Sequence, residues 1–388
     1  MNDRVLVLNS GSSSIKFSLY ARASDELQRQ QHGQISRLYG RPTLIQHNTN
    51  GTTEQTLPTG TGHDQALAWL LEQLALDIGQ ASGLAVGHRV VHGGTRFTAP
   101  VRVNDSVLEE LQAIESLAPL HQPYNVAAIR TIHERAPDVP QVACFDTAFH
   151  AGHDKPVNQF ALPGEYHDKG IRRYGFHGLS YEYIADRLQH MAPAMANERV
   201  IVAHLGNGAS LCALQNGKSI DTSMGFSTLE GLMMGTRCGR LDPGVLLYLL
   251  QTEGLDIDQV TELLYKQSGL KGVSDISHDM RDLIRHDTAA AREAIDLYID
   301  RLTSELGVLL MRLRGLDGLV FTGGVGEHQP LIRRRVCERL DWLGVRIEDA
   351  ANDHHDTRIS TDDSDIGIYC LQTDEEVMIA RHTRHLLS

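Results

Sequence analysis

The sequence predicts an α/β protein made of two related domains, and three glycine-rich turns are the main reason. Turns at Asn9–Ser14 and His204–Gly208 each lie between two apolar runs of strand length. These two strand–turn–strand units are about half a chain apart, which favours a duplicated domain with a phosphate-binding turn facing a shared cleft from each copy. A third turn, Gly323–Glu327, separates an apolar strand from the start of a helix. Strands and helices alternate elsewhere, as in α/β folds.

The first half of the chain contains a strand pair followed by helices. Residues 5–8 are apolar throughout, as in a buried strand, and residues 15–19 alternate between apolar and polar, as in a half-buried strand. Helical spacing extends over residues 107–117, and Asn104 or Asp105 can cap its start.

The end of this half has one more helix and one more strand. A helix is expected over residues 126–136, closed by Pro137, and residues 142–145 form a strand that leads into Asp146. The polar segment His150–Lys169 marks the beginning of the second domain.

The second half repeats the opening pattern. Residues 200–203 and 211–214 are expected strands, and Asn216–Gly217 is a strong hairpin signal that leads to a further strand near Ser219. Residues 319–322 form the strand that precedes the third glycine-rich turn.

Two helices complete the second half. A long helix is expected over residues 289–313, and one apolar stripe follows it, which indicates a core face with room for a dimer contact. The stripe contains Ile295, Ile299, Leu302, Leu306, Leu309 and Leu313. Thr373–Glu376 has the pattern of a capping box that opens the last helix.

The glycine-rich turns have the chemistry to bind anions. The first offers backbone N–H groups, hydroxyls and Lys16, although an ordinary Gly/Ser hairpin has the same appearance. It is not a Walker loop, because no Gly-Lys-Ser/Thr opens a helix there. The third turn, placed before a helix, suits a nucleotide.

A thirteen-residue segment, Glu230–Asp242, places Arg237 among small or flexible residues. Glycines let a backbone approach a ligand closely, and an arginine can present a planar charged fork to a carboxylate or phosphate. A surface loop whose arginines face water explains the segment equally well when it is considered alone.

Composition excludes several classes of function. A hydrophobic content of 41% is ordinary for a soluble protein, no apolar run approaches the length of a membrane span, and the N-terminus lacks a signal peptide's apolar core. A net charge of −13 argues against nucleic-acid binding. Anionic substrates would therefore need local positive charge, which Arg89, Arg237, Lys16 and a metal ion could provide.

Cysteine and histidine do not indicate a transition-metal site. The five cysteines are far apart and odd in number, as expected of reduced thiols in the cytoplasm. There is no His-Glu-x-x-His motif, and no carboxylates complete a zinc site around His150 and His153. His354 and His355 lie in a polar, aspartate-rich stretch that is expected to be a solvated loop.

The chain resembles the acetate and propionate kinase family of the actin-like phosphotransferase superfamily. The matching motifs extend from Asn9 to Glu376 in the family's order. They are NSGSSSIKF from Asn9, GHRVVHGG from Gly87, LAPLH from Leu117, FDTAFH from Phe145, YGFHG from Tyr174, HLGNGAS from His204, the Arg237 segment, and FTGGVGE from Phe321.

The resemblance implies a fold and a reaction. The fold would be two duplicated actin-like, ribonuclease H-like domains with a nucleotide cleft between them: residues 1–149 plus 377–388, and residues 150–376. The second domain would carry the adenosine site and the probable dimer interface. The reaction would be reversible, Mg²⁺-dependent, direct in-line transfer of a phosphoryl group from ATP to acetate, giving acetyl phosphate and ADP. Mn²⁺ could replace Mg²⁺, and the enzyme would be a cytoplasmic homodimer.

The resemblance also assigns roles to single residues. Arg89 would hold the acetate carboxylate, and Arg237 and His177 would contact the phosphoryl oxygens in the transition state. Asp146 and Glu375 would bind Mg²⁺ directly or through water, with Asn9 nearby, and Asp146 would act through the metal. His121 would have a supporting role. A buried core histidine is the alternative for His177, which lies in an aromatic-rich turn.

The remaining assignments concern the nucleotide and the acyl group. The nucleotide contacts would be Lys16, His204, Leu205, Gly206, Asn207, Gly208, Asp279, Met280, Arg281, Gly324, Val325, Gly326, Glu327 and His328. The acyl-methyl pocket would be formed by Val91, Leu120 and Phe176, with Thr228 as its fourth wall.

Three positions depart from the family's usual pattern. His328 and Asp374 each replace an asparagine, and Thr228 replaces a proline. A small apolar pocket distinguishes one methylene by only about 1–3 kcal/mol, so the choice between acetate and propionate stays open.

Two other classes of function stay as alternatives. A sugar or polyol kinase of the same superfamily would use Asp146 as a base, but Arg89 would then lack an anionic partner. A nucleotide-switched module without catalysis would resemble the chaperone ATPases, which normally carry a peptide-binding segment after the nucleotide-binding part.

Overall fold

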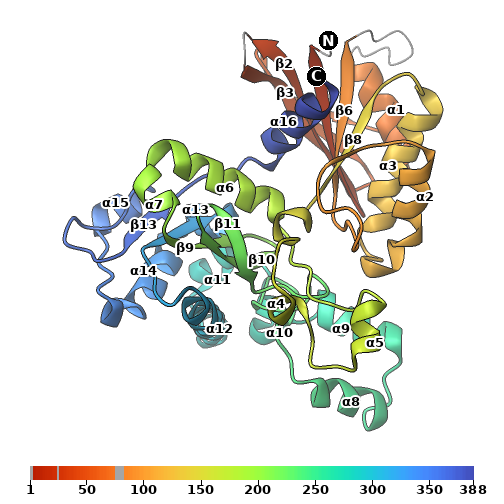
Figure 1. The fold of residues 1–388 in the computed structure, drawn as a ribbon. Helices are drawn as coiled ribbons and strands as arrows, with labels where there is room; N and C mark the ends of the chain where they lie inside the picture. Colours follow the sequence, from red (N-terminus) through yellow and green to blue (C-terminus); the bar gives the residue numbers. More distant parts are fainter. Residues whose placement is uncertain (1–2, 24–25, 75–82) are drawn as a thin grey trace. The chain divides into compact units, whose positions relative to one another are not determined.

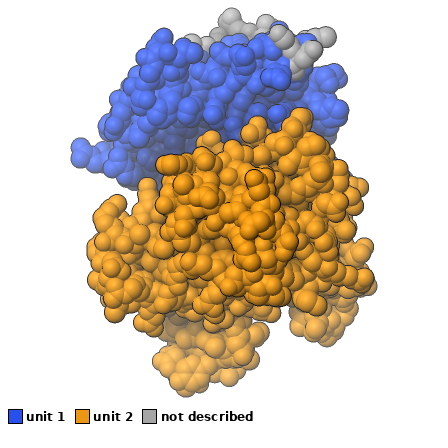
Figure 2. Space-filling model, turned by 90° about the vertical axis from the view of Figure 1, so that its left-hand side faces the viewer, with its two compact units in different colours: residues 1–149, 374–388 blue, residues 150–373 orange. Residues whose placement is uncertain are grey.

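The computed structural model describes residues 3–23, 26–74 and 83–388 of the chain (Figure 1). It divides into two compact units, coloured separately in Figure 2. Unit 1 contains Met1–Phe149 and Asp374–Ser388, and unit 2 contains His150–Thr373. The chain thus returns to unit 1 three residues earlier than the expected domain limit at residues 376 and 377.

The described part of unit 1 contains an eight-stranded sheet with the strand order β5-β4-β3-β2-β1-β6-β8-β7. The strands are β1 (Arg4–Gly11), β2 (Ser14–Ala23), β3 (Glu26–Ser36), β4 (Thr43–Asn48), β5 (Gly51–Thr56), β6 (Leu84–Val90), β7 (Val101–Arg102) and β8 (Gln141–Phe145). β1 is antiparallel to β2 and parallel to β6, and β6 is parallel to β8.

Helices cover both faces of this sheet (Figure 1). They are α1 (His63–Gln73), α2 (Asp105–Ala113), the 3₁₀ helix η2 (Glu115–Leu117), α3 (Gln122–Arg135) and α16 (Glu375–Leu387). A further 3₁₀ turn, η3 (Ala148–His150), lies at the boundary of the two units. α16 packs on β1, β6 and β8, while α1 and α3 contribute Leu70 and Ile132 to the apolar core under the opposite face. A side chain at Gly87 would collide with Thr383 and Ile379, so glycine allows α16 to lie close to β6.

Unit 2 contains a five-stranded sheet with the order β11-β10-β9-β12-β13. Its strands are β9 (Arg199–Leu205), β10 (Ala209–Gln215), β11 (Lys218–Thr222), β12 (Gly318–Thr322) and β13 (Gly367–Cys370). Its helices are α4 (Lys155–Asn158), α5 (Gly164–Asp168), α6 (Gly178–Met191), α7 (Pro193–Ala196), α8 (Pro243–Gln251), α9 (Ile257–Lys266), α10 (Gly269–Ser274), α11 (Met280–His286), α12 (Ala289–Leu313), α13 (Gly323–His328), α14 (Pro330–Glu338), η4 (Asp341–Leu343) and α15 (Asp349–Asp353).

The two sheets share one topology, which confirms the predicted duplication. In unit 1, three antiparallel strands (β3, β2, β1) are followed in the sheet by two parallel ones (β6, β8). In unit 2, β11, β10 and β9 are antiparallel, and β12 and β13 continue the sheet in parallel. Each unit is therefore an actin-like α/β domain, and each places the turn between its first two strands at the same end of its sheet.

Several local predictions can be compared with these elements. The long helix α12 begins and ends at the predicted residues, and all six residues of its apolar stripe are buried. Helix α2 ends at Ala113, earlier than expected, because the chain tightens into a 3₁₀ turn at Glu115–Leu117.

The predicted capping box at Thr373 is wrong. Asp374 caps α16, and its carboxylate accepts a hydrogen bond from the N–H of Val377. Thr373 has other partners: its N–H donates to Glu327 and its hydroxyl contacts Ser180.

Candidate active site

In unit 1, four polar residues converge where β1, β6 and β8 end and α16 begins. Asn9 lies near the end of β1, Arg89 on β6, Asp146 directly after β8, and Glu375 in the first turn of α16. We call these residues the Arg89 cluster. Parallel strands bring their carboxyl ends to the same edge of a sheet, so this meeting of distant segments follows from the topology.

The guanidinium of Arg89 is the centre of this cluster. Its Nε donates to Oδ1 of Asp146 at 2.9 Å and its Nη2 to Oδ2 at 2.5 Å, which forms a bidentate pair. Nη1 donates to Oδ1 of Asn9 at 3.3 Å, and Nε lies 3.8 Å from Oε2 of Glu375. Burial lowers the pKa of Arg89, but Asp146 and Glu375 outweigh this effect and raise that pKa above its ordinary value.

The oxygen atoms of the cluster suit Mg²⁺ as a bound ion. Asn9, Asp146 and Glu375 present an amide oxygen and two carboxylates, and hard oxygen ligands are those preferred by Mg²⁺. Within residues 3–23, 26–74 and 83–388, no group of three or more His, Cys, Asp or Glu side chains is arranged to hold a metal ion. The cation among these oxygen atoms is the guanidinium of Arg89 itself.

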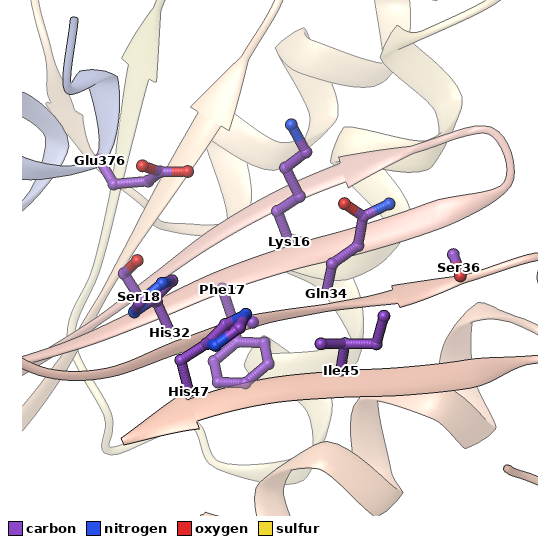
Figure 3. A pocket seen from close by; sticks show the side chains of 10 residues that line it. Lys16, Phe17, Ser18, His32, Gln34, Ser36, Ile45, His47 and Glu376 are labelled. Carbon is purple, nitrogen blue, oxygen red and sulfur yellow. The ribbon is translucent and has the colours of Figure 1, made fainter. Parts of the chain in front are cut away.

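Lys16 lies beside the Arg89 cluster, on the neighbouring strand. Its Cα is the register partner of Asn9 across β1 and β2. It lines a pocket of about 400 Å³ on one face of β2, β3 and β4, near the first turn of α16 (Figure 3). Glu376 also lines this pocket, and burial, together with Asp374 and Glu375, raises the pKa of its carboxyl group. The pocket therefore combines a lysine with an acid that takes up a proton more readily than usual.

The predicted acyl pocket is divided between the two units. Val91 is buried in unit 1, where its N–H donates to Asn125, and Leu120 is half-buried just before His121, the N-cap residue of α3. Phe176 and Thr228 belong to unit 2. A pocket formed by these residues stays a prediction.

In unit 2, two of the predicted phosphoryl contacts border the turn between β9 and β10. A side chain at Gly208 would meet Nε2 of His177 at 3.1 Å and Nη1 of Arg237 at 3.6 Å. The absence of a side chain at Gly208 thus leaves a space next to two nitrogen atoms, as a phosphate-binding turn requires. We call residues 206–208 the Gly208 turn.

His177 is held in place by its neighbours. It is the N-cap residue of α6, with a left-handed backbone (φ 59°), and its ring stacks on that of His204 at a centroid distance of 4.3 Å. Its Nδ1 lies 2.8 Å from Oγ of Ser210, which contacts the hydroxyl of Tyr181. His177 is half-buried, so the alternative of a core histidine does not describe it.

The loop that carries Arg237 is ordered by backbone hydrogen bonds. Met234 N–H donates to the carbonyl of Arg237, and Leu270 and Ser268 donate back to the loop at Met234 and Thr236. The guanidinium of Arg237 donates to the carbonyl of Thr228 at 3.1 Å. Arg237 is half-buried in this ordered loop, which disfavours a surface loop whose arginines merely face water. Binding of a phosphoryl group by Arg237 stays a prediction.

The predicted nucleotide segments lie around the same turn. Gly206 and Gly324 approach closely, since a side chain at Gly206 would meet the Gly324 nitrogen at 3.9 Å and His204 Nε2 at 3.7 Å. A side chain at Gly235 would meet Asn207 Oδ1 at 3.3 Å. Leu205, Val325 and Gly326 belong to the β9 and α13 backbones that hold this arrangement.

Other predicted nucleotide residues have structural partners. Glu327 Oε1 accepts hydrogen bonds from the N–H groups of Gly323 and Thr373, so its carboxylate closes the turn before α13. His328 is exposed. Asp279 caps α11, and its hydrogen bonds from Arg281 lower the pKa of its carboxyl group. Met280 is buried beside them.

Some supporting residues were not identified from the sequence. Ser210 lies in the HLGNGAS motif, which was its only signal, while Tyr181 and Ser180 gave none. Ser180 links Nδ1 of His204 to the hydroxyl of Thr373. Asn125 donates to the carbonyl of Ser10 and accepts from Val91, tying the first glycine-rich turn to the residues after β6.

His150 and His153 have partners in the protein itself. His150 Nδ1 and His153 Nε2 both contact the hydroxyl of Ser219, at 2.8 and 2.7 Å, and His150 Nε2 donates to the carbonyl of Phe176. These rings link residues 150–153 to β11.

Known proteins resemble this chain over its whole length. A protein of Rhodopseudomonas palustris named acetate kinase is 50% identical over 393 residues, covering 100% of this chain and 99% of its own length. An acetate kinase of Rhizobium meliloti is 46% identical with 100% and 99% coverage.

Solved structures give the same result. The acetate kinase of Porphyromonas gingivalis has a TM-score of 0.90 at 36% identity, with 100% of both chains covered. A propionate kinase of Francisella tularensis has a TM-score of 0.92 at 35% identity, with 99% of both chains covered. The model of the acetokinase family matches residues 4–381. With the duplicated α/β domains and the glycine-rich turns in place, the chain belongs to the acetokinase family.

Proposed function

We propose that the protein catalyses the reversible, Mg²⁺-dependent transfer of the γ-phosphoryl group of ATP to acetate, which gives acetyl phosphate and ADP. The observation that supports this most is the family match over residues 4–381. The arrangement of His177 and Arg237 at the Gly208 turn agrees with it, because both can stabilise a phosphoryl group.

The chemistry requires positioning more than proton transfer. Acetate is already ionised at neutral pH, so no general base is needed to activate it. Two anions must be aligned while charge spreads over the transferring phosphoryl group. In the proposed mechanism Arg89 holds the carboxylate, and Arg237 and His177 neutralise the phosphoryl oxygens. Asn9, Asp146 and Glu375 would hold Mg²⁺, which neutralises the nucleotide phosphates when bound.

This mechanism uses Asp146 differently from a sugar kinase. A base for a hydroxyl substrate needs a carboxylate oxygen that is accessible to the proton, whereas both oxygens of Asp146 accept from Arg89. Arg89 also provides a cation for which a neutral sugar has no use. A cation at this position therefore favours a carboxylate as the phosphoryl acceptor.

Propionate is the second candidate substrate. The similarity to the propionate kinase of Francisella tularensis and the replacement of a usual proline by Thr228 both support testing it. We expect acetate to be preferred. If the hydroxyl of Thr228 faces the acyl chain, it must stay hydrated or find a hydrogen-bond partner, which limits the benefit of a longer chain.

We also propose that the active protein is a homodimer formed through unit 2. Helix α8 has no buried residue, and its Leu247 and Tyr248 are each 53% exposed. Met311 on α12 is 74% exposed. An apolar helix that stays uncovered indicates an interaction surface, and a second copy of this chain is the proposed partner.

The proposed compartment is the cytoplasm, since all five cysteines are free thiols. No helix among the described residues has the length and apolarity to cross a membrane.

The test is an assay with ATP, Mg²⁺ and a series of short acids, with hydroxylamine trapping the acyl phosphate. Acetyl hydroxamate formation in step with ADP is the expected result. Phosphorylation of glycerol or glucose without hydroxamate would refute the proposal, and a higher kcat/KM for propionate would assign the second substrate.

A further inference from the structure

The proposed function gives the Arg89 cluster two roles, and the observed pairing of Arg89 with Asp146 conflicts with both. Its fork is expected to bind a carboxylate substrate, but both terminal oxygens of Asp146 already accept from it. The oxygens expected to bind a divalent cation are the same ones that surround the guanidinium. A guanidinium and a divalent cation held close to the same oxygens repel each other, which disfavours their binding at the same time.

The charges favour an exchange between the two cations. Asp146 and Glu375 carry two negative charges, and the guanidinium of Arg89 balances one of them. A divalent cation would balance both. Asp146 is 1% exposed, so its carboxylate is strongly disfavoured without a cation nearby. The side chain of Arg89 is 21% exposed, so it is less deeply buried than the carboxylate of Asp146.

We propose that the guanidinium of Arg89 and a divalent cation compete for the oxygens of Asn9, Asp146 and Glu375, so that Arg89 is released to bind a carboxylate when the divalent cation enters. This inference rests on the proposed function for the identity of the two ligands. In the protein without ligands, Arg89 acts as a resident counter-ion that lowers the affinity of the cluster for free divalent cations.

The exchange makes the binding of the two ligands cooperative. A divalent cation frees the fork of Arg89, and a carboxylate that engages this fork frees the oxygens of the cluster. By linkage, each ligand must then strengthen the binding of the other by the same factor. The cluster would therefore favour a state in which both are present, before any phosphoryl transfer occurs.

The first test measures Mn²⁺ binding to nucleotide-free protein by electron paramagnetic resonance of the free ion. Mn²⁺ prefers the same oxygen ligands and can be observed directly. Arg89→Ala should bind Mn²⁺ about tenfold more tightly than the unmodified protein, a coupling within the usual range. Arg89→Lys should lie between them, because a lysine supplies the charge without the bidentate fork.

Arg29→Ala is the matched control. Arg29 is an arginine of the same unit, its Nη1 lies 3.4 Å from Asp374, next to Glu375, and its side chain is 40% exposed. The Arg29→Ala substitution removes the same charge as Arg89→Ala, but outside the cluster. Mn²⁺ affinity should therefore change by less than about twofold, as expected for an exposed ion pair. The proposed competition would be refuted if both variants bound Mn²⁺ more tightly by the same factor. It would also be refuted if a folded Arg89→Ala protein bound Mn²⁺ no more tightly than the unmodified protein.

A second measurement uses the unmodified protein and does not depend on the folding of a variant. Calorimetric titration of acetate should give about tenfold tighter binding with saturating Mg²⁺ than with a chelator, the reciprocal of the first coupling. An acetate affinity independent of Mg²⁺ would contradict the proposal. Both experiments exclude turnover, so they can fail while the assay still yields acetyl phosphate. Failure of the proposed function would instead appear as no acyl phosphate in that assay.

Discussion

At the scale of single residues, the candidate site depends on side chains held by a second set of contacts. Arg237 is fixed by a hydrogen bond to the carbonyl of Thr228, and His177 by stacking on His204 and by Ser210. Preorganised donors of this kind stabilise a transition state without having to reorient during the reaction.

Replacing Arg237 tests the proposed neutralisation of the phosphoryl group. Arg237→Ala should lower kcat by about 10³–10⁵ with little change in the KM for ATP, as for other arginines that act in phosphoryl-transfer transition states. Arg237→Lys should recover little of the lost kcat, because lysine has no bidentate guanidinium fork. Steady-state kinetics measures both effects.

Arg240 provides the control for Arg237. It lies in the same loop, but its side chain is 66% exposed and paired with Glu305 at 3.1 Å. Arg240→Ala should therefore keep most of kcat. A defect in Arg237→Ala confined to the KM for ATP would show that Arg237 only binds the nucleotide.

Ser210 is predicted to position His177. If its hydroxyl donates to Nδ1 of His177, the neutral imidazole carries its proton on Nε2, the nitrogen beside Gly208. Ser210→Ala removes this hydrogen bond, worth about 1 kcal/mol, so kcat should fall roughly fivefold.

Nitrogen NMR of His177 distinguishes positioning from a structural role of Ser210. The signals should indicate the Nε2–H tautomer in the unmodified protein and a mixture in Ser210→Ala. Ser210→Thr keeps the hydroxyl and should preserve the original tautomer. An unchanged tautomer in Ser210→Ala would refute this role.

At the scale of elements, buried histidines join segments that are far apart in the chain. Residues 150–153 are fastened to β11 through Ser219, which contacts both His150 and His153. Burial, together with the nearby His153, lowers the pKa of His150 to about 3. This contact therefore requires neutral imidazole.

The pH dependence of stability follows from this pKa. The unfolded chain has an ordinary histidine pKa near 6.5, so between about pH 6.5 and pH 3 it binds more protons than the folded protein. Above pH 6.5 the protein has the full contribution of His150 to its free energy of unfolding. As the pH falls through the window, this free energy decreases by up to about 1.4 kcal/mol per pH unit.

Urea unfolding across this pH range measures the effect. His150→Gln removes the titrating group and should make the free energy of unfolding depend less steeply on pH. His354→Gln, at an exposed position, is the control and should leave the slope unchanged. Equal slopes for His150→Gln and the unmodified protein would disprove the assignment.

At the scale of the whole molecule, the exposed apolar surface of α8 and α12 predicts the oligomeric state. Leu247→Glu together with Met311→Glu would place charges in the proposed dimer interface. Loss of the apolar contacts of these two exposed side chains should weaken the dimer by at least about thirtyfold, if they contribute as anchor residues of an interface do. Sedimentation velocity at several concentrations measures this change.

Trp342→Glu is the matched control for the dimer prediction. Trp342 is also large, apolar and exposed, but it lies in η4, outside α8 and α12. The Trp342→Glu substitution should leave the dimer dissociation constant unchanged. A monomer in the unmodified protein, or equal weakening by both changes, would refute the proposed surface.

Much of the architecture could be predicted from local sequence. A continuous apolar run places β1 and alternating apolar residues place β2. The Asn-Gly pair at residues 216 and 217 places the turn between β10 and β11, and the apolar stripe places α12. These features depend on neighbours within one element, and the hydrophobic period reports them directly. The repeated strand–turn–strand unit also identified the duplication, because each copy carries its own glycine-rich turn.

The partners of the polar side chains were decided only by the tertiary structure. Nothing in the spacing of Asn9, Arg89, Asp146 and Glu375 indicates that one guanidinium lies among the other three, since they are brought together from β1, β6, β8 and α16. The capping residue of α16 likewise depended on distant contacts, because Glu327 and Ser180 engage Thr373 and leave Asp374 as the cap. Hydrophobic patterns are local and periodic, whereas hydrogen bonds between distant segments depend on how the sheet aligns its strands. The sequence alone therefore determined the elements, the duplication and the family, and the packing of the sheets determined which charges meet.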